Sequence, residues 1–182
     1  MAGLMAYKRT LEHLRQRDAI IIADIKRGDI AKTAEMYAKA HFTGDFEADF
    51  ITLNPYMGMD TLTPFLPYFK EQNKGAFVLI RTSNPGAQDI EYINTTDNRH
   101  VYNVVGEKIN TLGKEFIGEC GFSAIGGVMG CTHADEAKEV RESLDSTFFL
   151  IPGYGAQGGK AEDIALYLKE GNGGVVNASR SI

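Results

Sequence analysis

The feature that most constrains this chain is an apolar run at residues 20–23 that ends in Asp24 and continues into Lys26 and Asp29. A continuous β-branched run predicts a strand buried on both faces, as in a parallel sheet. Its polar end is then the carboxyl end of a strand, where α/β folds place their chemistry. In extended geometry Asp24 and Lys26 share one face. An exposed turn with ion pairs is the alternative, but the position at the mouth of an apolar strand favours a catalytic group.

Five further apolar segments alternate with helical patterns along the chain. The predicted strands are 20–24, 49–53, 76–80, 123–128, 147–151 and 174–177. The predicted helices are 4–17, 31–42, 64–71, 105–116, a segment behind a capping box at Thr132 and Asp135, and one that starts near Glu162. Residues 88–101 form a polar insertion. Such a βα repeat predicts a parallel sheet. A doubly wound sheet and a (β/α)8 barrel both remain open, although a barrel needs eight strands.

Composition narrows the classes of function. The 182 residues predict a single domain, 1–182, and the net charge of −5, with acids and bases interspersed, indicates no nucleic-acid surface. No apolar run is long enough for a membrane span or a signal peptide. Cys120 and Cys131 form no CxxC pair, which is typical of a reduced, cytoplasmic protein. The sequence Cys131-Thr132-His133 lacks a second ligand pair, so we expect no metal site.

A glycine-rich segment near the end of the chain distinguishes the two folds. Gly153-x-Gly155-x-x-Gly158 matches the dinucleotide fingerprint, but that fold needs an acidic residue after the next strand, where Asn177 and Arg180 stand. Barrel enzymes instead bind phosphate with the loops after their last two strands. Glycine-rich backbone, Gln157 and Arg180 suit a phosphate dianion. Glycines that serve only as tight turns would leave the pairing with Arg180 unexplained, so the barrel is favoured.

Several motifs together resemble one family. The segment Asp24–Thr33 resembles the D-x-K-x-x-D-I-x-x-T signature of the orotidine 5′-phosphate decarboxylase family. The segments that resemble its longer, bacterial-type (type 2) branch are Thr52–Gly58, Arg81–Gly86, Pro152–Gly159 and Ser179-Arg180. The D-x-K-x-x-D motif alone is shared with sugar-phosphate decarboxylases and aldolases of the same superfamily. The combination with the later motifs is specific.

The resemblance implies a (β/α)8 TIM barrel that forms a homodimer in the cytoplasm. It implies decarboxylation of orotidine 5′-phosphate to uridine 5′-phosphate in pyrimidine synthesis, with no metal and no organic cofactor. By the match, Lys26 donates a proton to C6, Asp24 lies beside the scissile carboxylate, and Asp29 reaches the ribose in the neighbouring subunit's site. The remaining substrate-binding residues implied are Ile30 and Thr33 across the interface, Ser83 at the pyrimidine, Pro152 at the start of the glycine-rich loop, and Gln157 and Arg180 at the phosphate.

The chain departs from the family pattern at its ends. Family members begin with two further βα units, which carry a ribose-binding Asp and a second Lys, and nothing here matches them. We therefore expect about six βα units of an incomplete barrel, a fragment of a longer gene that is inactive alone. Two other functions remain open: a sugar-phosphate decarboxylase or aldolase of the same superfamily, which typically uses Mg²⁺, and an inactive truncated copy.

Overall fold

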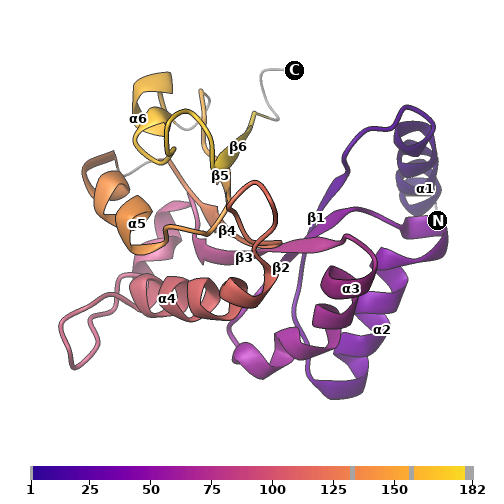
Figure 1. Ribbon diagram of the computed structural model, residues 1–182, viewed down its shortest axis with the longest axis horizontal. Helices are drawn as coiled ribbons and strands as arrows, with labels where there is room; N and C mark the ends of the chain where they lie inside the picture. The colour runs from indigo at the N-terminus through magenta and orange to yellow at the C-terminus, as the bar shows by residue number, and fades with distance from the viewer. Residues whose placement is uncertain (1, 132–133, 156–157, 179–182) are drawn as a thin grey trace. The chain divides into compact units, whose positions relative to one another are not determined.

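A computed structural model describes residues 2–131, 134–155 and 158–178. Strands and helices alternate along the chain (Figure 1). The strands are β1 (Ile22–Arg27), β2 (Phe50–Leu53), β3 (Gly75–Arg81), β4 (Ile125–Met129), β5 (Phe149–Pro152) and β6 (Gly174–Asn177). The α-helices are α1 (Ala2–Arg15), α2 (Ala31–Phe42), α3 (Leu66–Glu71), α4 (Val101–Gly113), α5 (Ala137–Ser143) and α6 (Ala161–Ala165). The 3-10 helices are η1 (Gly44–Phe46), η2 (Met59–Phe65), η3 (Pro85–Asp89), η4 (Lys114–Phe116) and η5 (Ala134–Glu136).

The strands are neighbours in sequence order, β1-β2-β3-β4-β5-β6, and the pairs β1–β2, β4–β5 and β5–β6 are parallel. This sequential parallel order is that of consecutive βα units in a (β/α)8 barrel, so the predicted fold class is confirmed. The chain divides into two compact units, residues 1–76 and 77–182. The expectation of a single domain stays a prediction.

The first unit contains the β1–β2 ladder, and its helix α2 packs against η2 and α3. The α2 helix buries Ala34, Ala38 and Phe42, at the helical spacing that the sequence predicts. The ring of Phe42 meets Phe65 and Phe69 edge-on, with centroids 6.4 and 5.9 Å away. Figure 1 shows α2 and α3 side by side, which these ring contacts explain. Aromatic packing therefore holds the helical layer of this unit together.

The first strand differs from the prediction. It starts at Ile22 and continues through the polar residues to Arg27, instead of spanning 20–24. Burial alternates through the isoleucine run and into the strand: Ile20 is 76% exposed, Ile21 is 5% exposed, Ile22 is half-buried and Ala23 is 4% exposed. The expected burial on both faces is therefore wrong for the described chain. The isoleucine run predicts a strand, but only the neighbouring elements decide which face of a strand is covered.

The second unit contains the sheet β4–β5–β6 and helices α4, α5 and α6. All five residues of β4 are buried, although its glycines are weak strand formers. An added Cβ at Gly126 would lie 2.5 Å from the Phe148 carbonyl oxygen and 2.8 Å from the Phe77 ring, and one at Gly127 would meet Ile80 Cδ1. The two glycines thus admit the close approach of large neighbouring side chains.

Some predicted boundaries shift. The helical stretch expected at 64–71 begins earlier, as η2 from Met59, with Pro64 inside it. The polar insertion 88–101 is closed by an antiparallel bridge between Asn94 and His100. Thr132, which belongs to the predicted capping box, lies outside the described residues. No described helix is both long and apolar enough to cross a membrane.

The packing around β4 yields a stability prediction. Gly126→Ala should destabilise the fold by about 1–3 kcal/mol, because the new methyl group overpacks the strand against a backbone carbonyl. Gly3→Ala is the matched control: nothing lies within 4 Å of the added Cβ, and the helix should gain up to about 1 kcal/mol. Urea unfolding of both variants measures the difference. Equal stability of Gly126→Ala and the unmodified chain would contradict the packing argument.

Candidate active site

Two of the predicted catalytic side chains meet at the end of β1. Lys26 Nζ lies 2.6 Å from Asp24 Oδ1, and the two side chains are 50% and 46% exposed. The two side chains therefore meet, although Lys26 lacks the extended backbone on which the predicted shared face rested. The same Asp24 oxygen accepts a hydrogen bond from Thr52 Oγ1 at 2.9 Å. The hydrogen bond from Thr52 fixes Asp24, while both side chains of the ion pair remain accessible to solvent.

The backbone carries strain at the same point. The β1–β2 register is interrupted between Ala23 and Arg27, and Lys26 has φ +46°. A non-glycine residue in this left-handed region costs roughly 1–2 kcal/mol. Its amide N–H donates to Thr52 Oγ1 at 2.8 Å. Ala31, the first residue of α2, also has a positive φ of 44°. Strain of this kind gathers at functional sites.

Arg27 anchors the strand end to α2. Its guanidinium lies 5.3 Å from the centre of the Tyr37 ring, and its Nε donates to His41 Nε2 at 3.3 Å. Burial, together with the positive charge of Arg27, lowers the pKa of His41. Its Nδ1 is buried and has no partner among the described atoms. The lowered pKa favours the neutral imidazole, whose Nε2 accepts the hydrogen bond from Arg27.

The residues predicted to act across a dimer interface lie in the turn into α2. Asp29 Oδ1 accepts the Ile30 amide at 2.8 Å, and within the described residues Asp29 forms no ion pair with Lys26. Ile30 is 57% exposed, and Thr33 is also exposed. Ile30 and Thr33 are therefore accessible to solvent, and Asp29 is half-buried.

In the second unit, Ser83 lies on the loop that follows β3. The preceding Thr82 is held by Glu91, whose carboxylate accepts the Thr82 amide at 2.9 Å and its hydroxyl at 2.8 Å. Ser83 is half-buried, and a Cβ on Gly130 would lie 3.1 Å from Ser83 Cα. The loop is therefore packed closely against the end of β4.

The glycine-rich loop after β5 is partly closed on itself. The Pro152 carbonyl accepts both the amide of Cys131, at 3.2 Å, and its thiol, at 3.3 Å. Three loop amides, those of Gly155, Gly158 and Gly159, bond to carbonyl oxygens within the loop. These three N–H groups are thus occupied in this arrangement, and phosphate binding by the loop stays a prediction. Gln157 and Arg180 lie outside the described residues.

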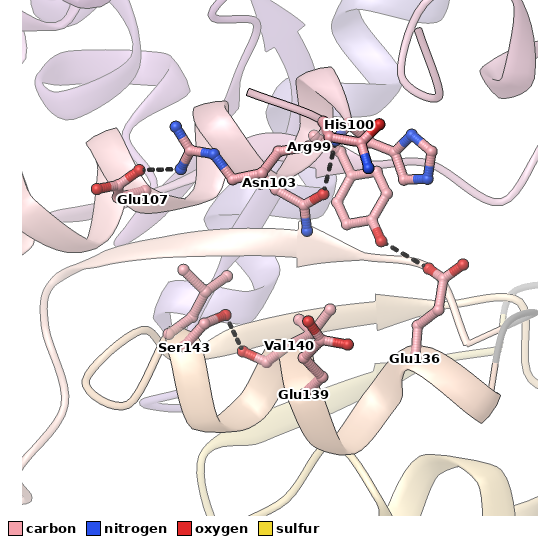
Figure 2. A pocket seen from close by; sticks show the side chains of 11 residues that line it. Arg99, His100, Asn103, Glu107, Glu136, Glu139, Val140 and Ser143 are labelled. Carbon is pink, nitrogen blue, oxygen red and sulfur yellow. Dashed lines mark hydrogen bonds and ion pairs between the residues drawn. The ribbon is translucent and has the colours of Figure 1, made fainter. Parts of the chain in front are cut away.

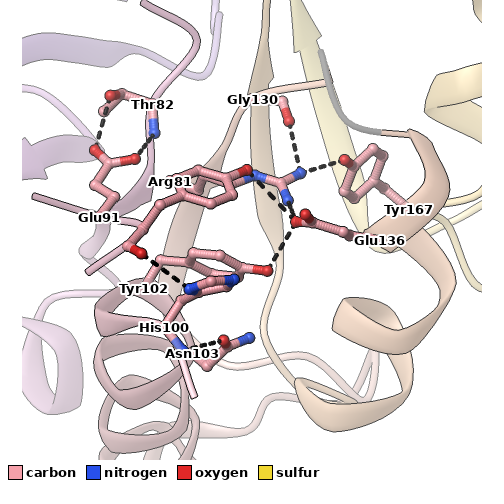
Figure 3. A network of polar contacts seen from close by, with 10 residues as sticks. Arg81, Thr82, Glu91, His100, Tyr102, Asn103, Gly130, Glu136 and Tyr167 are labelled. Carbon is pink, nitrogen blue, oxygen red and sulfur yellow. Dashed lines mark hydrogen bonds and ion pairs between the residues drawn. The ribbon is translucent and has the colours of Figure 1, made fainter. Parts of the chain in front are cut away.

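Figure 3 shows a buried network that sequence reasoning missed. Arg81, at the end of β3, is 0% exposed. It donates to Glu136 Oε2 at 2.5 Å, to the Gly130 carbonyl at 3.1 Å and to the Tyr167 hydroxyl. The Tyr102 hydroxyl donates to the same Glu136 oxygen at 2.7 Å, and burial raises the pKa of Tyr167 to about 12. The sequence signal for this network was the charged Arg81, directly after the apolar strand 76–80.

The second unit also contains a cavity of about 540 Å³ between the start of α4 and α5 (Figure 2). Its lining residues are Asn98, Arg99, His100, Tyr102, Asn103, Glu107, Glu136, Glu139, Val140, Ser143 and Leu144. No predicted site residue is among them. In the described part of the chain, no three His, Cys, Asp or Glu side chains are grouped as a metal site requires.

Comparisons with known proteins agree on one family. The model of the family described as orotidine 5′-phosphate decarboxylase / HUMPS matches residues 2–182. An orotidine 5′-phosphate decarboxylase of Clostridium perfringens is 68% identical over all 182 residues, which span 63% of its length. One of Clostridium acetobutylicum is 63% identical and is spanned over 64% of its length. The chain thus covers less than two thirds of these relatives.

Comparison with solved structures points to the same family. A Toxoplasma gondii protein assigned as an orotidine-monophosphate decarboxylase superimposes with a TM-score of 0.85 at 32% identity, over 96% of this chain and 63% of that one. The Leishmania donovani OMP decarboxylase has a TM-score of 0.71 at 34% identity, over 86% of this chain and 58% of its own. These relatives share the order of βα units described above.

The environment of His41 predicts a pH effect on stability. Because its pKa is lowered in the folded chain, the unfolded chain binds the proton more readily once the pH falls below the ordinary value of 6.5. The free energy of unfolding should therefore decrease as the pH drops below 6.5. His41→Gln keeps an acceptor for Arg27 but does not titrate. The variant should therefore lose less stability than the unmodified chain when the pH is lowered. Urea unfolding at pH 7.5 and pH 5.5 measures both losses, and equal losses would contradict the assignment.

Proposed function

This chain belongs to the orotidine 5′-phosphate decarboxylase / HUMPS family, and on that premise we propose that it carries the catalytic lysine of an orotidine 5′-phosphate decarboxylase. The observation that carries the proposal is the contact of 2.6 Å between Lys26 Nζ and Asp24 Oδ1 at the carboxyl end of β1. Curated relatives of up to 68% identity bear this activity in their names. The proposed reaction converts orotidine 5′-phosphate to uridine 5′-phosphate and CO₂, with no metal and no organic cofactor.

The chemistry requires a fixed positive charge. When the bond from C6 to the carboxylate breaks, CO₂ leaves and the electron pair stays on C6, without a conjugated electron sink. The ammonium of Lys26 would stabilise this charge as it develops and then transfer a proton to C6. A cation that is already positioned costs no reorganisation during the reaction. The half-exposed Lys26 side chain leaves room for a substrate on its open side.

Asp24 would orient this ammonium and lie beside the substrate carboxylate. Each tenfold in rate requires about 1.4 kcal/mol of barrier, so one ion contact does not supply the whole acceleration. Binding energy from the remote phosphate is the natural supplement. We propose that Gln157 and Arg180 hold the phosphate, that Ser83 contacts the pyrimidine and that Pro152 lines the same site.

The proposed enzyme is a homodimer. Along the turn into α2 and the helix, Ile30 and Met36 are 57% and 49% exposed, Thr33 is also exposed, and Asp29 is half-buried. Exposed apolar side chains beside a carboxylate suit an interface with a second copy. Asp29 would then reach the ribose in the partner's site; within the described residues it forms no ion pair with Lys26 of its own chain. The cytoplasmic location stays a prediction from composition.

A sugar-phosphate decarboxylase or aldolase is the second candidate, because the family description covers two groups of enzymes and the D-x-K-x-x-D motif is common to the superfamily. The two candidates differ in metal dependence, since the sugar-phosphate enzymes typically use Mg²⁺. Turnover of orotidine 5′-phosphate that persists in excess EDTA would favour the decarboxylase. Turnover of a sugar phosphate that EDTA abolishes would favour the alternative.

The role of Lys26 is tested in a chain completed to the length of its curated relatives. Lys26→Ala should reduce kcat by about 10²- to 10⁴-fold, the usual range for a group that transfers a proton. Lys138→Ala, on the solvent-exposed face of α5, should retain turnover and is the control. Loss of ultraviolet absorbance of orotidine 5′-phosphate measures the rate. Near-normal turnover by Lys26→Ala would remove Lys26 from the proton-donor role.

The dimer assignment predicts rescue between two inactive variants. Mixing Asp29→Ala and Lys26→Ala subunits should restore part of the activity, because a mixed dimer contains one site with both residues intact. Subunit exchange is confirmed separately, with differently tagged chains. No recovery after confirmed exchange would place Asp29 in the site of its own subunit.

A further inference from the structure

We propose that Thr52 is a positioning residue, whose hydroxyl holds the Lys26 backbone and the Asp24 carboxylate in the arrangement that the reaction needs. Thr52 opens the segment Thr52–Gly58 that resembles the family, but the resemblance implies no role for it. The proposal rests on the proposed function, and it adds a residue that acts on the catalytic pair without touching the substrate.

The geometry at Thr52 is specific. The residue lies in β2 and is 0% exposed. Its Oγ1 accepts the Lys26 amide at 2.8 Å and donates to Asp24 Oδ1 at 2.9 Å. A hydroxyl has only one proton. The direction of both bonds is therefore fixed: the proton goes to the carboxylate, and a lone pair receives the amide.

The strand register explains why a side chain is needed here. Ala23 pairs with Ile51, and the next aligned pair is Arg27 with Leu53. Three residues of β1, from Asp24 to Lys26, thus stand opposite Thr52 alone, as in an enlarged β-bulge. The Lys26 amide binds a side-chain oxygen where a regular ladder would offer a carbonyl. This hydrogen bond holds the Lys26 backbone in its left-handed conformation, at φ +46°.

As a consequence, one atom, Thr52 Oγ1, holds both members of the Asp24–Lys26 pair. The Lys26 main chain and the Asp24 carboxylate each bond to Thr52 Oγ1, while Lys26 Nζ bonds to Asp24 at 2.6 Å. This closed ring of contacts restrains the ammonium before the substrate binds. Misplacing a catalytic group by about 1 Å costs on the order of 100-fold in rate. A merely structural threonine would affect stability and leave kcat unchanged.

The test compares three variants in a chain completed to the length of its relatives. Thr52→Val removes the hydroxyl at nearly constant volume and should lower kcat about 10- to 100-fold with KM within about threefold of the unmodified chain. Thr52→Ser retains the hydroxyl and should recover most of the turnover. Thr147→Val is the matched control, because Thr147 is also 0% exposed and its hydroxyl bonds to Asn110 at 2.9 Å. It should lose stability but keep its kcat.

A second measurement does not depend on activity. Hydrogen exchange at the Lys26 amide, followed by NMR, should be slow in the unmodified chain and in Thr52→Ser, and about tenfold faster or more in Thr52→Val. If the unmodified chain does not turn over orotidine 5′-phosphate, the proposed function fails, and exchange at Lys26 still decides whether Thr52 holds the backbone. If Thr52→Val does not fold, Thr52→Ser against Thr52→Ala gives the same hydroxyl comparison.

Three results would overturn the proposal. The first is unchanged protection of the Lys26 amide when the hydroxyl is absent. The second is a normal kcat in the variant without the hydroxyl. The third is an equal loss in Thr52→Ser, which would show that the methyl group, and not the hydroxyl, is what the site needs.

Discussion

The interruption of the parallel ladder between β1 and β2 is the constraint on which the proposed site depends. In a regular strand, the Lys26 amide would donate to a β2 carbonyl and the Lys26 backbone would stay extended. Here the chain bulges and the amide turns to Thr52, while pairing resumes at Arg27, whose carbonyl accepts the Asn54 amide at 2.7 Å. The strained Lys26 is thus bonded to Thr52 and directly precedes Arg27, which is itself anchored to β2's end at Asn54. Strain persists only when the surroundings over-determine it, and this arrangement does so.

Buried arginines perform a related task in the second unit. Removing a guanidinium from water costs several kcal/mol unless hydrogen bonds replace the solvent. The hydrogen-bond partners of Arg81 lie directly after β4 (Gly130), in η5 (Glu136) and after α6 (Tyr167), so one cation links the ends of several elements. Arg141 donates to the Thr147 carbonyl at 2.9 Å and lies 4.2 Å from the centre of the Phe149 ring. Its burial lowers its pKa to about 10. The loop that carries Ser83 follows directly from the first of these anchors.

Much of the fold was accessible to sequence reasoning. Helix α2 spans 31–42 and strand β6 spans 174–177, as predicted, because apolar periodicity and turn residues are local signals. The boundaries of β1 were less accessible, because the strand continues through charged residues that a hydropathy pattern excludes. The glycines of β4 have weak strand propensity, and their place is explained only by Phe77 and Ile80 from a strand some fifty residues earlier.

The sequence by itself determined the order of the βα units, the meeting of Asp24 and Lys26 at the end of a strand, and the resemblance to one family. These properties follow from spacing along the chain. Only the tertiary structure decided that Thr52 holds the end of β1, that Arg81 anchors the end of β3, and that three amides of the glycine-rich loop are occupied. Such roles depend on which atoms distant segments bring within hydrogen-bond distance. Residue spacing does not encode that distance, because it is set by packing between strands and helices.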